Sequence, residues 1–284
     1  GRFFDQWIYG AGAPRFTASA PYDASARQES LTVKQTQRVG GAVGLFSVPM
    51  DVVISTAEGN QKFSVLISKA EETFHFPING APLNVLFDKG SRVLKSVDFR
   101  KAPAEWIFQM QHAEDAVDRA FAADALGDVK DNSAVIAALG AAAQSDGFWG
   151  VRVQALTALG RIGGDEAGKQ VQAATANAEP WVREVAVDQL GRFKSQAGLP
   201  ERLAELSKHD GAYRVRAAAL NSYAQLKPSG GLALLQDAAK SDSPDDVVRR
   251  AALRAMGSLG ENKAVGTLLD WSEEGKAIGL RTAA

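Results

Sequence analysis

The sequence predicts a two-part fold, a β-sandwich followed by an all-α repeat solenoid. Residues 15–100 alternate apolar and polar residues in short runs that are separated by turn sequences. A period of two in side-chain character is typical of half-buried strands. Residues 113–284 instead repeat one helical motif at a nearly constant interval, which is typical of a repeat array. We therefore expect three parts, at residues 1–14, 15–100 and 101–284.

The first part is a short apolar helix. In RFFDQWIY, Phe3, Phe4, Trp7 and Ile8 recur at helical spacing, and a Gly-Ala-Gly sequence and a proline follow them. A helix this short is only marginally stable alone, so we expect it to pack on another surface.

Residues 15–100 are predicted to form a small antiparallel β-sandwich. The alternation is clearest in LTVKQTQ, KFSVLIS and ETFHFPI. Turn sequences such as Glu-Gly-Asn and Asn-Gly separate the runs. Short strands at regular spacing favour a sandwich. The strand candidates are residues 16–22, 30–37, 50–56, 61–68, 72–78, 84–87 and 93–99. Residues 100–113 then form a rigid join, in which Pro103 can begin a helix.

The solenoid is predicted from one motif, seen as VRVQALTALG, VREVAVDQLG, VRAAALNSYA and VRRAALRAMG. Its arginine recurs as Arg152, Arg183, Arg216 and Arg249, at intervals of 31, 33 and 33 residues. A weaker copy precedes these at Arg119, and a truncated one follows. This self-similarity predicts stacked helix pairs that share one continuous core. We expect about five pairs over residues 113–284.

Within each copy, apolar residues lie three, four and seven positions after the arginine, which defines one helix face. A glycine follows the apolar run in four copies, where we expect it to end the helix in the left-handed conformation. These glycines are Gly127, Gly160, Gly191 and Gly257. A second apolar segment follows each motif and supplies the other helix of the pair.

The repeated arginine has two interpretations. Six guanidinium groups on one edge could bind phosphates. However, Asp115, Glu179 and Asp245 lie four residues before the arginine in three copies, which is helical pairing distance. We therefore predict a structural ladder that joins neighbouring repeats. Its members are Arg119, Arg152, Arg183, Arg216 and Arg249. The pattern resembles HEAT-like repeats of the short kind, with roughly 30 residues each.

The sequence contains no recognisable active site, and we predict no catalytic, cofactor-binding or metal-binding residue in this chain. His75, His112 and His209 do not lie at metal-ligand spacing, and the H-E-x-x-H signature is absent. Neither a Walker loop nor a G-x-S-x-G elbow is present. The chain has no cysteine, which excludes disulfides and thiolate chemistry and leaves the compartment open.

Charge and hydropathy exclude two classes of partner. The formal net charge is −1, and the 32 basic and 33 acidic residues are well mixed. Nucleic-acid binding favours a concentrated basic patch, so we expect no nucleic-acid partner. No apolar run approaches the ~20 residues that span a bilayer, so we expect no membrane span.

The segment FFDQWIYGAGAP, a following strand that ends in PYDAS, and LTVKQTQ together resemble a known passage. They are similar to the exit from the catalytic domain in zinc aminopeptidases of the aminopeptidase N family, a gluzincin metallopeptidase family. There a β-sandwich and a HEAT-like helical domain follow in the same order. The resemblance implies that residues 1–14 are the tail of a missing catalytic domain. That domain would hold the zinc, and Phe3, Phe4 and Trp7 of this chain would contact it. The chain also begins without Met, which fits a fragment of a longer protein.

Two functions follow from this resemblance and from the repeats. The first is the non-catalytic carboxyl-terminal part of a zinc aminopeptidase, which shapes and limits access to the active-site chamber and cleaves nothing by itself. Its partners would be its own amino-terminal catalytic domain and, in the full-length protein, peptide or protein substrates. The alternative is a protein-interaction scaffold that binds a partner on its concave face, as solenoids commonly do. Such a scaffold could belong to an aminopeptidase-like protein without zinc.

Overall fold

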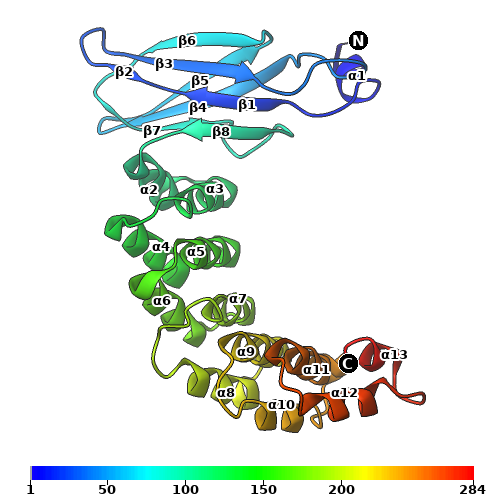
Figure 1. Cartoon of the computed structure of the whole chain (residues 1–284). Coiled ribbons are helices and arrows are strands. Elements are labelled where there is room, and N and C mark those ends of the chain that lie inside the picture. The colour runs from blue at the N-terminus through cyan, green and yellow to red at the C-terminus, as the bar shows by residue number, and fades with distance from the viewer. Residues whose placement is uncertain (1) are drawn as a thin grey trace. The chain divides into compact units, whose positions relative to one another are not determined.

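The structure is a computed structural model that describes residues 2–284 and contains two compact units, divided between Ala122 and Ala123. Strands dominate the first unit and helices the second, which confirms the predicted fold class (Figure 1). The first unit contains α1 (Arg2–Trp7), β1 (Arg15–Ser19), β2 (Tyr22–Asp23), β3 (Gln28–Gln35), β4 (Val48–Thr56), β5 (Gly59–Ile67), β6 (Glu71–Pro77), β7 (Pro82–Phe87), β8 (Ser96–Arg100) and α2 (Pro103–His112).

Helix α3 (Ala116–Leu126) spans the division between the units. The elements after it are α4 (Ser133–Ser145), α5 (Trp149–Ile162), α6 (Gly164–Ala173), η1 (Ala174–Ala176), α7 (Pro180–Leu190), α8 (Leu199–His209), α9 (Tyr213–Leu226), α10 (Leu232–Ala238), η2 (Pro244–Asp246), α11 (Val247–Leu259), α12 (Ala264–Ser272) and α13 (Ile278–Arg281).

The strands form two sheets. One has the order β2-β3-β1-β8, with β6 also paired to β3, and the other has the order β5-β4-β7. Neighbouring strands are antiparallel, as the turn sequences predict, with one difference: β8 runs parallel to β1. The difference follows from topology, because β7 belongs to the other sheet. The chain crosses between the sheets before β8 and does not return through a tight hairpin.

The core of the first unit lies between the two sheets. Along β3, buried positions alternate with more exposed ones, as a sheet with one covered face requires. Apolar side chains of both sheets meet there, which makes the unit a sandwich. The buried cluster contains Phe16, Ala18, Leu31, Val33, Phe46, Val48, Met50, Val52, Ile54, Ile67, Phe76, Ile78, Val85, Phe87 and Phe99.

Two glutamines hold the loop between β3 and β4 and the helix α1. The buried Gln35 donates from Nε2 to the Phe46 carbonyl at 2.7 Å and accepts from the Phe46 N–H at 2.9 Å. The Ser47 N–H donates to Gln6 Oε1 at 2.7 Å, and the Trp7 ring packs on Phe46 with centroids 5.3 Å apart. A short helix is thereby fixed to the sandwich through side chains rather than through its own stability.

We predict that Gln35→Leu lowers the free energy of unfolding by about 2–3 kcal/mol, because it leaves the buried N–H and C=O of Phe46 without their partner. Gln28→Leu is the matched control: Gln28 lies in the same strand, and none of the described residues 2–284 bonds to its side chain. Denaturant unfolding measures both variants. Equal losses in the two would contradict the role given to Gln35.

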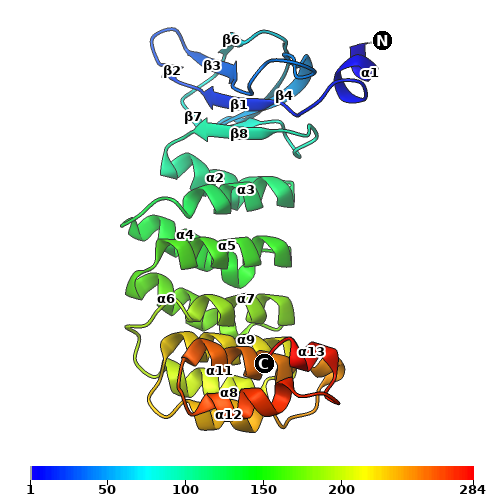
Figure 2. The ribbon, with the colours of Figure 1, turned by 45° about the vertical axis from the view of Figure 1, so that its right-hand side comes forward.

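In the second unit, the motif helices stack on one another. Helix α5 packs on α7, α7 on α9 and α9 on α11, while α4 packs on α6 in a second layer (Figure 2). The residues three, four and seven positions after each arginine are buried, which confirms the predicted helix face. They are Ala155, Leu156, Leu159, Ala186, Val187, Leu190, Ala219, Leu220, Tyr223, Ala252, Leu253 and Met256.

The predicted left-handed conformation of the repeat glycines is wrong. The described glycines with positive φ do not include Gly127, Gly160, Gly191 or Gly257, and α5 ends at Gly163 and α11 at Gly260 instead. Close approach explains Gly160 and Gly191, because a Cβ there would lie 2.0 Å from Gln189 Oε1 and 2.5 Å from Gln225 Oε1. A polar side chain of the next repeat occupies the space of the missing methyl group, so these glycines serve helix packing.

Candidate functional site

The repeat arginines bond to the ends of the preceding helices. Arg119 and Arg183 each donate from Nη1 to two successive carbonyls, and the first of these belongs to the C-cap residue of the preceding helix. Arg216 and Arg249 donate from Nε to the C-cap carbonyls of α8 and α10, at 2.5 and 2.9 Å. The last carbonyls of a helix have no partner within the helix, and a cation there also interacts favourably with the helix dipole.

The carboxylates that pair with Arg183 and Arg249 are not the ones at i−4. Arg183 forms a bidentate pair with Asp210, with both N···O distances at 2.9 Å, and Arg249 pairs with Asp242 and Asp246. Burial alone would raise the pKa of Asp210, but hydrogen bonds from Arg183 and from a backbone N–H outweigh it and lower that pKa. In Arg152 the buried Nε has no hydrogen-bond partner within residues 2–284. The assignment of all five arginines to one ladder stays a prediction.

We predict that Arg183→Met lowers the free energy of unfolding by about 3 kcal/mol, because it leaves the mostly buried Asp210 carboxylate and two carbonyls without their donor. The stability of Arg183→Lys should lie between those of Arg183→Met and the unaltered chain, since lysine keeps the positive charge but cannot form the bidentate pair. Arg192→Met, on an exposed side chain, is the control, with an expected change within about 0.5 kcal/mol. Thermal and denaturant unfolding measure the variants. Equal losses of stability in Arg183→Met and Arg192→Met would contradict the role given to Arg183.

The three residues predicted to contact a catalytic domain are placed differently from one another. Phe3 and Phe4 are exposed, at 64% and 54%, whereas Trp7 packs on the sandwich core. Ile8 and Tyr9 are also exposed and extend the apolar surface of Phe3 and Phe4. Their contact with another domain stays a prediction.

The histidines make local contacts. His75 lies 2.9 Å from the Ser30 hydroxyl, His112 stacks on Phe108, and His209 lies 4.0 Å from Glu205. Among residues 2–284, no group of three or more His, Cys, Asp or Glu side chains is placed to hold a metal ion. Over the same range, no helix combines the length and the apolar character needed to cross a bilayer.

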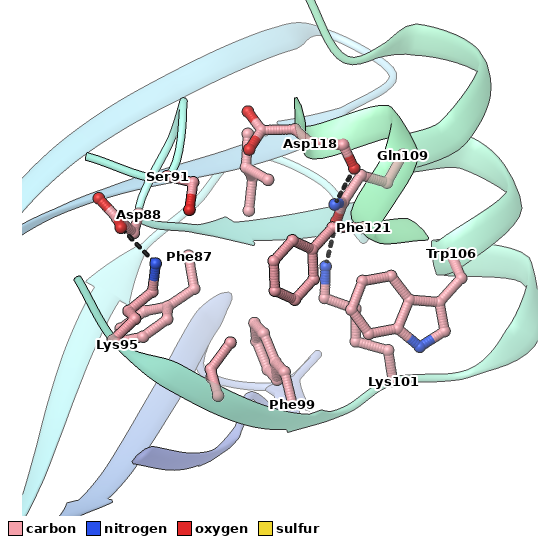
Figure 3. Close-up of a pocket in the computed structure, with 12 residues that line it drawn as sticks. Phe87, Asp88, Ser91, Lys95, Phe99, Lys101, Trp106, Gln109, Asp118 and Phe121 are labelled. Carbon is pink, nitrogen blue, oxygen red and sulfur yellow. Dashed lines mark hydrogen bonds and ion pairs between the residues drawn. The ribbon is translucent and has the colours of Figure 1, made fainter. Parts of the chain in front are cut away.

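The first unit contains a pocket around the partly buried Lys101 (Figure 3). Lys101 Nζ donates to Asn84 Oδ1 at 2.8 Å and to Gln109 Oε1 at 2.6 Å, and it lies over the rings of Phe99 and Trp106. The cavity volume is about 30 Å³, which is room for about one water molecule and too small for a substrate. Two amide acceptors and two aromatic faces suit an ammonium group that holds β7, β8 and α2 together.

Two buried groups in this unit have strongly shifted pKa values. Burial lowers the pKa of Lys101 to about 7, against the opposing effect of the nearby carboxylates of Glu105 and Asp118. Burial, and then repulsion from Glu105, raises the pKa of Glu29 to about 7. Glu29 is fully buried, and neither of its carboxylate oxygens has a hydrogen-bond partner within residues 2–284. Its neutral form is therefore favoured in the folded state.

We predict opposite pH dependences from these two groups. Between pH 4.5 and about 7 the folded state holds the Glu29 proton more tightly, so that group should cost roughly 3 kcal/mol of stability as pH rises through this range. Between about 7 and 10.5 the unfolded state holds the Lys101 proton more tightly, so stability should rise with pH.

Urea unfolding at a series of pH values measures the free energy of unfolding over both ranges, the acid limb below about pH 7 and the alkaline limb above it. Glu29→Gln should flatten the acid limb and Lys101→Met the alkaline one, each leaving the other limb unchanged. If the free energy of unfolding of Glu29→Gln fell with pH below pH 7 as steeply as that of the unaltered chain, the acid limb would not come from Glu29.

A second candidate site is an open groove over α7, α9 and α11, with a volume of about 970 Å³. In Figure 1 these helices lie on the inner side of the curved second unit. Val185, Ala217, Ala218 and Ala251 line the groove with small or apolar side chains, and charged side chains surround them.

Exposed aromatic rings lie at one edge of this groove. Trp149 stacks on Trp181 with ring centroids 6.1 Å apart, and Tyr213 is 40% exposed. The Arg214 guanidinium lies 3.7 Å from the centre of the Trp181 ring and 2.9 Å from the Glu184 carboxylate. Large exposed rings beside small apolar residues are typical of protein-interaction surfaces.

Our sequence reasoning missed this aromatic edge, although a signal exists. An aromatic residue lies two or three positions before the arginine in three successive copies, in FWGVR, PWVR and YRVR. Trp149, Trp181 and Tyr213 each occupy the first turn of a motif helix, where a side chain can remain outside the stack.

Comparisons with known proteins identify the repeats. The family model described as HEAT repeats matches residues 104–191, 169–247 and 199–284, which together cover more than half of the chain. The chain belongs to the HEAT-repeat family. No curated protein matches the sequence of this HEAT-repeat protein.

Many solved structures resemble the HEAT-repeat protein, including the two that follow. Aminopeptidase A of Legionella pneumophila, in complex with aspartic acid, aligns with 96% of the chain at a TM-score of 0.54 and 12% identity. The chain spans only 35% of the length of that enzyme, and the likeness shows the fold alone. The complex of CpcE and CpcF of phycocyanin lyase from Nostoc sp. PCC7120 aligns with 65% of this chain and 75% of that one, at a TM-score of 0.47 and 23% identity.

Proposed function

We propose that this chain is the non-catalytic carboxyl-terminal region of a zinc aminopeptidase of the aminopeptidase N family. The observation that carries the proposal is the order of parts: a sandwich and then a HEAT array align over 96% of the chain with part of a solved aminopeptidase. Fold likeness alone does not transfer an activity. The FFDQW and LTVKQTQ segments support the proposal independently, because they resemble the exit from the catalytic domain of that family.

In this proposal the sandwich is a spacer and the helical array is a wall of the active-site chamber. The exposed side chains of Phe3, Phe4, Ile8 and Tyr9 would be covered by the catalytic domain, since an apolar patch of this kind is typical of an interface. Zinc would be held entirely by that domain. The chain itself would set which peptides can enter, through steric access and surface charge.

A second function, a protein-interaction scaffold, is favoured by the groove over α7, α9 and α11. Exposed tryptophans beside small apolar residues suit a bound partner chain, whether or not a peptidase precedes the array. The two functions differ in what the rest of the protein contains. They agree that this chain is not itself an enzyme.

We predict that the purified chain hydrolyses no aminoacyl chromogenic substrate, with or without added Zn²⁺, because the proposed zinc ligands lie outside it. A chelator-treated sample is the control, and zinc-dependent hydrolysis by the chain would refute the proposal. The coding sequence upstream of residue 1 separates the two functions. An H-E-x-x-H motif with a second Glu about twenty residues later would support the peptidase, and its absence would favour the scaffold.

A further inference from the structure

The groove of the second unit has an ordered charge pattern. The side chains one and five residues after each repeat arginine lie one helical turn apart, and those of α7, α9 and α11 line the groove. On α7 they are Glu184 and Asp188, and on α11 they are Arg250 and Arg254. On α9, between them, the same positions hold Ala217 and Asn221. At these positions the groove is therefore acidic along α7, uncharged along α9 and basic along α11, while Arg214 also lines it from the first turn of α9.

The outer charges are available to a ligand. Asp188 and Arg254 are both exposed, and neither forms an ion pair with any of the residues 2–284. Glu184 is engaged by Arg214, whereas Asp188 accepts a hydrogen bond from the neutral Gln189 amide, at 3.2 Å, and has no cationic partner within residues 2–284. Arg250 and Arg254 lie four residues apart on α11, and neither has an ion-pair partner among residues 2–284. An anionic ligand would therefore relieve the repulsion between these like charges.

The spacing of the helices fixes the length of a suitable ligand. Packed helices lie about 8–10 Å apart, so the acidic and basic helices are separated by about 16–20 Å. An extended chain rises about 3.3 Å per residue, and residues on one face recur every second position. Two side chains about six residues apart thus point the same way and span this distance.

We propose that this groove binds an extended peptide segment that carries a basic and an acidic side chain about six residues apart. The basic side chain pairs with Asp188, and the acidic one pairs with Arg254 and Arg250. Small residues between them lie over Ala217, where the exposed Asn221 amide can bond to the peptide backbone. The rings of Trp181 and Tyr213 provide apolar contact at the edge.

This inference goes beyond the proposed function, because it uses only surfaces of the second unit. It holds whether the parent protein is a peptidase or a scaffold. Failure of the hydrolysis prediction would leave it intact, and failure of peptide binding would leave the aminopeptidase proposal intact.

Fluorescence anisotropy with synthetic peptides tests the proposal on the whole chain. The probe is an end-blocked, dye-labelled Ser/Ala peptide with one Lys and one Glu about six positions apart, made in both orders. Matched peptides have the two charges adjacent, or have Gln in place of Lys or Glu. We expect the separated-charge peptide, in one order or both, to bind about tenfold more tightly than the adjacent-charge peptide, and to weaken as salt is raised.

Variants of the chain assign the charges. Arg254→Gln should weaken binding of the separated-charge peptide about three- to fivefold without affecting the peptide that lacks Glu. Asp188→Asn should also weaken binding of the separated-charge peptide, but without affecting the peptide that lacks Lys. Lys169→Gln and Glu166→Gln remove the same charges from the exposed surface of α6 and should change nothing.

Two results would overturn the proposal. One is equal affinity for separated-charge and adjacent-charge peptides in both orders. The other is equal weakening by the α6 control variants, which would indicate binding by net charge alone. Both Asp188 and Arg254 are exposed, so their variants should fold as the unaltered chain does, and circular dichroism checks this.

Discussion

A helix that ends inside a stack leaves carbonyl groups that must find donors, and the second unit depends on how this requirement is met. A guanidinium from the second helix of a pair reaches back to the end of the first, as Arg183 and Arg216 do. In these pairs the bond therefore closes the hairpin before the hairpin meets its neighbour. Asp210, in the turn between α8 and α9, accepts from Arg183 of the preceding pair and from the Ala212 N–H, so the same arginine also joins neighbouring pairs. Without these bonds the buried apolar faces would still attract, but the angle within each pair would not be set.

Both units bury polar atoms that have no hydrogen-bond partner within residues 2–284. In the helical unit Ser222 and Arg249 are matched to backbone carbonyls, whereas Arg152 Nε and Gln189 Oε1 have no partner among the described residues. In the sandwich unit, Gln35 and Lys101 are matched, whereas Glu29 is buried without a hydrogen bond. An unmatched carboxyl is tolerated because it can take a proton, which removes the charge but not the loss of hydration. Loss of that proton should lower the stability of the sandwich as pH rises from 4.5 to about 7, and the opposite effect of Lys101 follows above about 7.

Sequence reasoning succeeded where a periodic pattern reports burial. The positions three, four and seven after each arginine were predicted as a core face because helix geometry leaves little choice. It failed where the answer depends on a neighbouring repeat. Gly160 has the sequence context of a helix end, yet its conformation is helical, because Gln189 of the following repeat needs the space. The pairing of Arg183 with Asp210 was missed for the same reason, since a contact across 27 residues has no local signal. The aromatic edge does leave a periodic signal in the sequence, but core packing does not require particular residues at exposed positions, so a search for buried faces does not select them.

The order of charges across α7, α9 and α11 has a mechanical consequence. A solenoid bends by small rotations between neighbouring repeats, and opposite charges on its inner face favour a tighter bend. At physiological ionic strength the screening length is about 8 Å, well below the separation of the two charged helices, so the attraction is weak. At about 0.01 M salt the screening length grows to about 30 Å, so the charges of α7 and α11 attract one another across the groove. The curvature of this array should thus increase as the salt concentration is lowered.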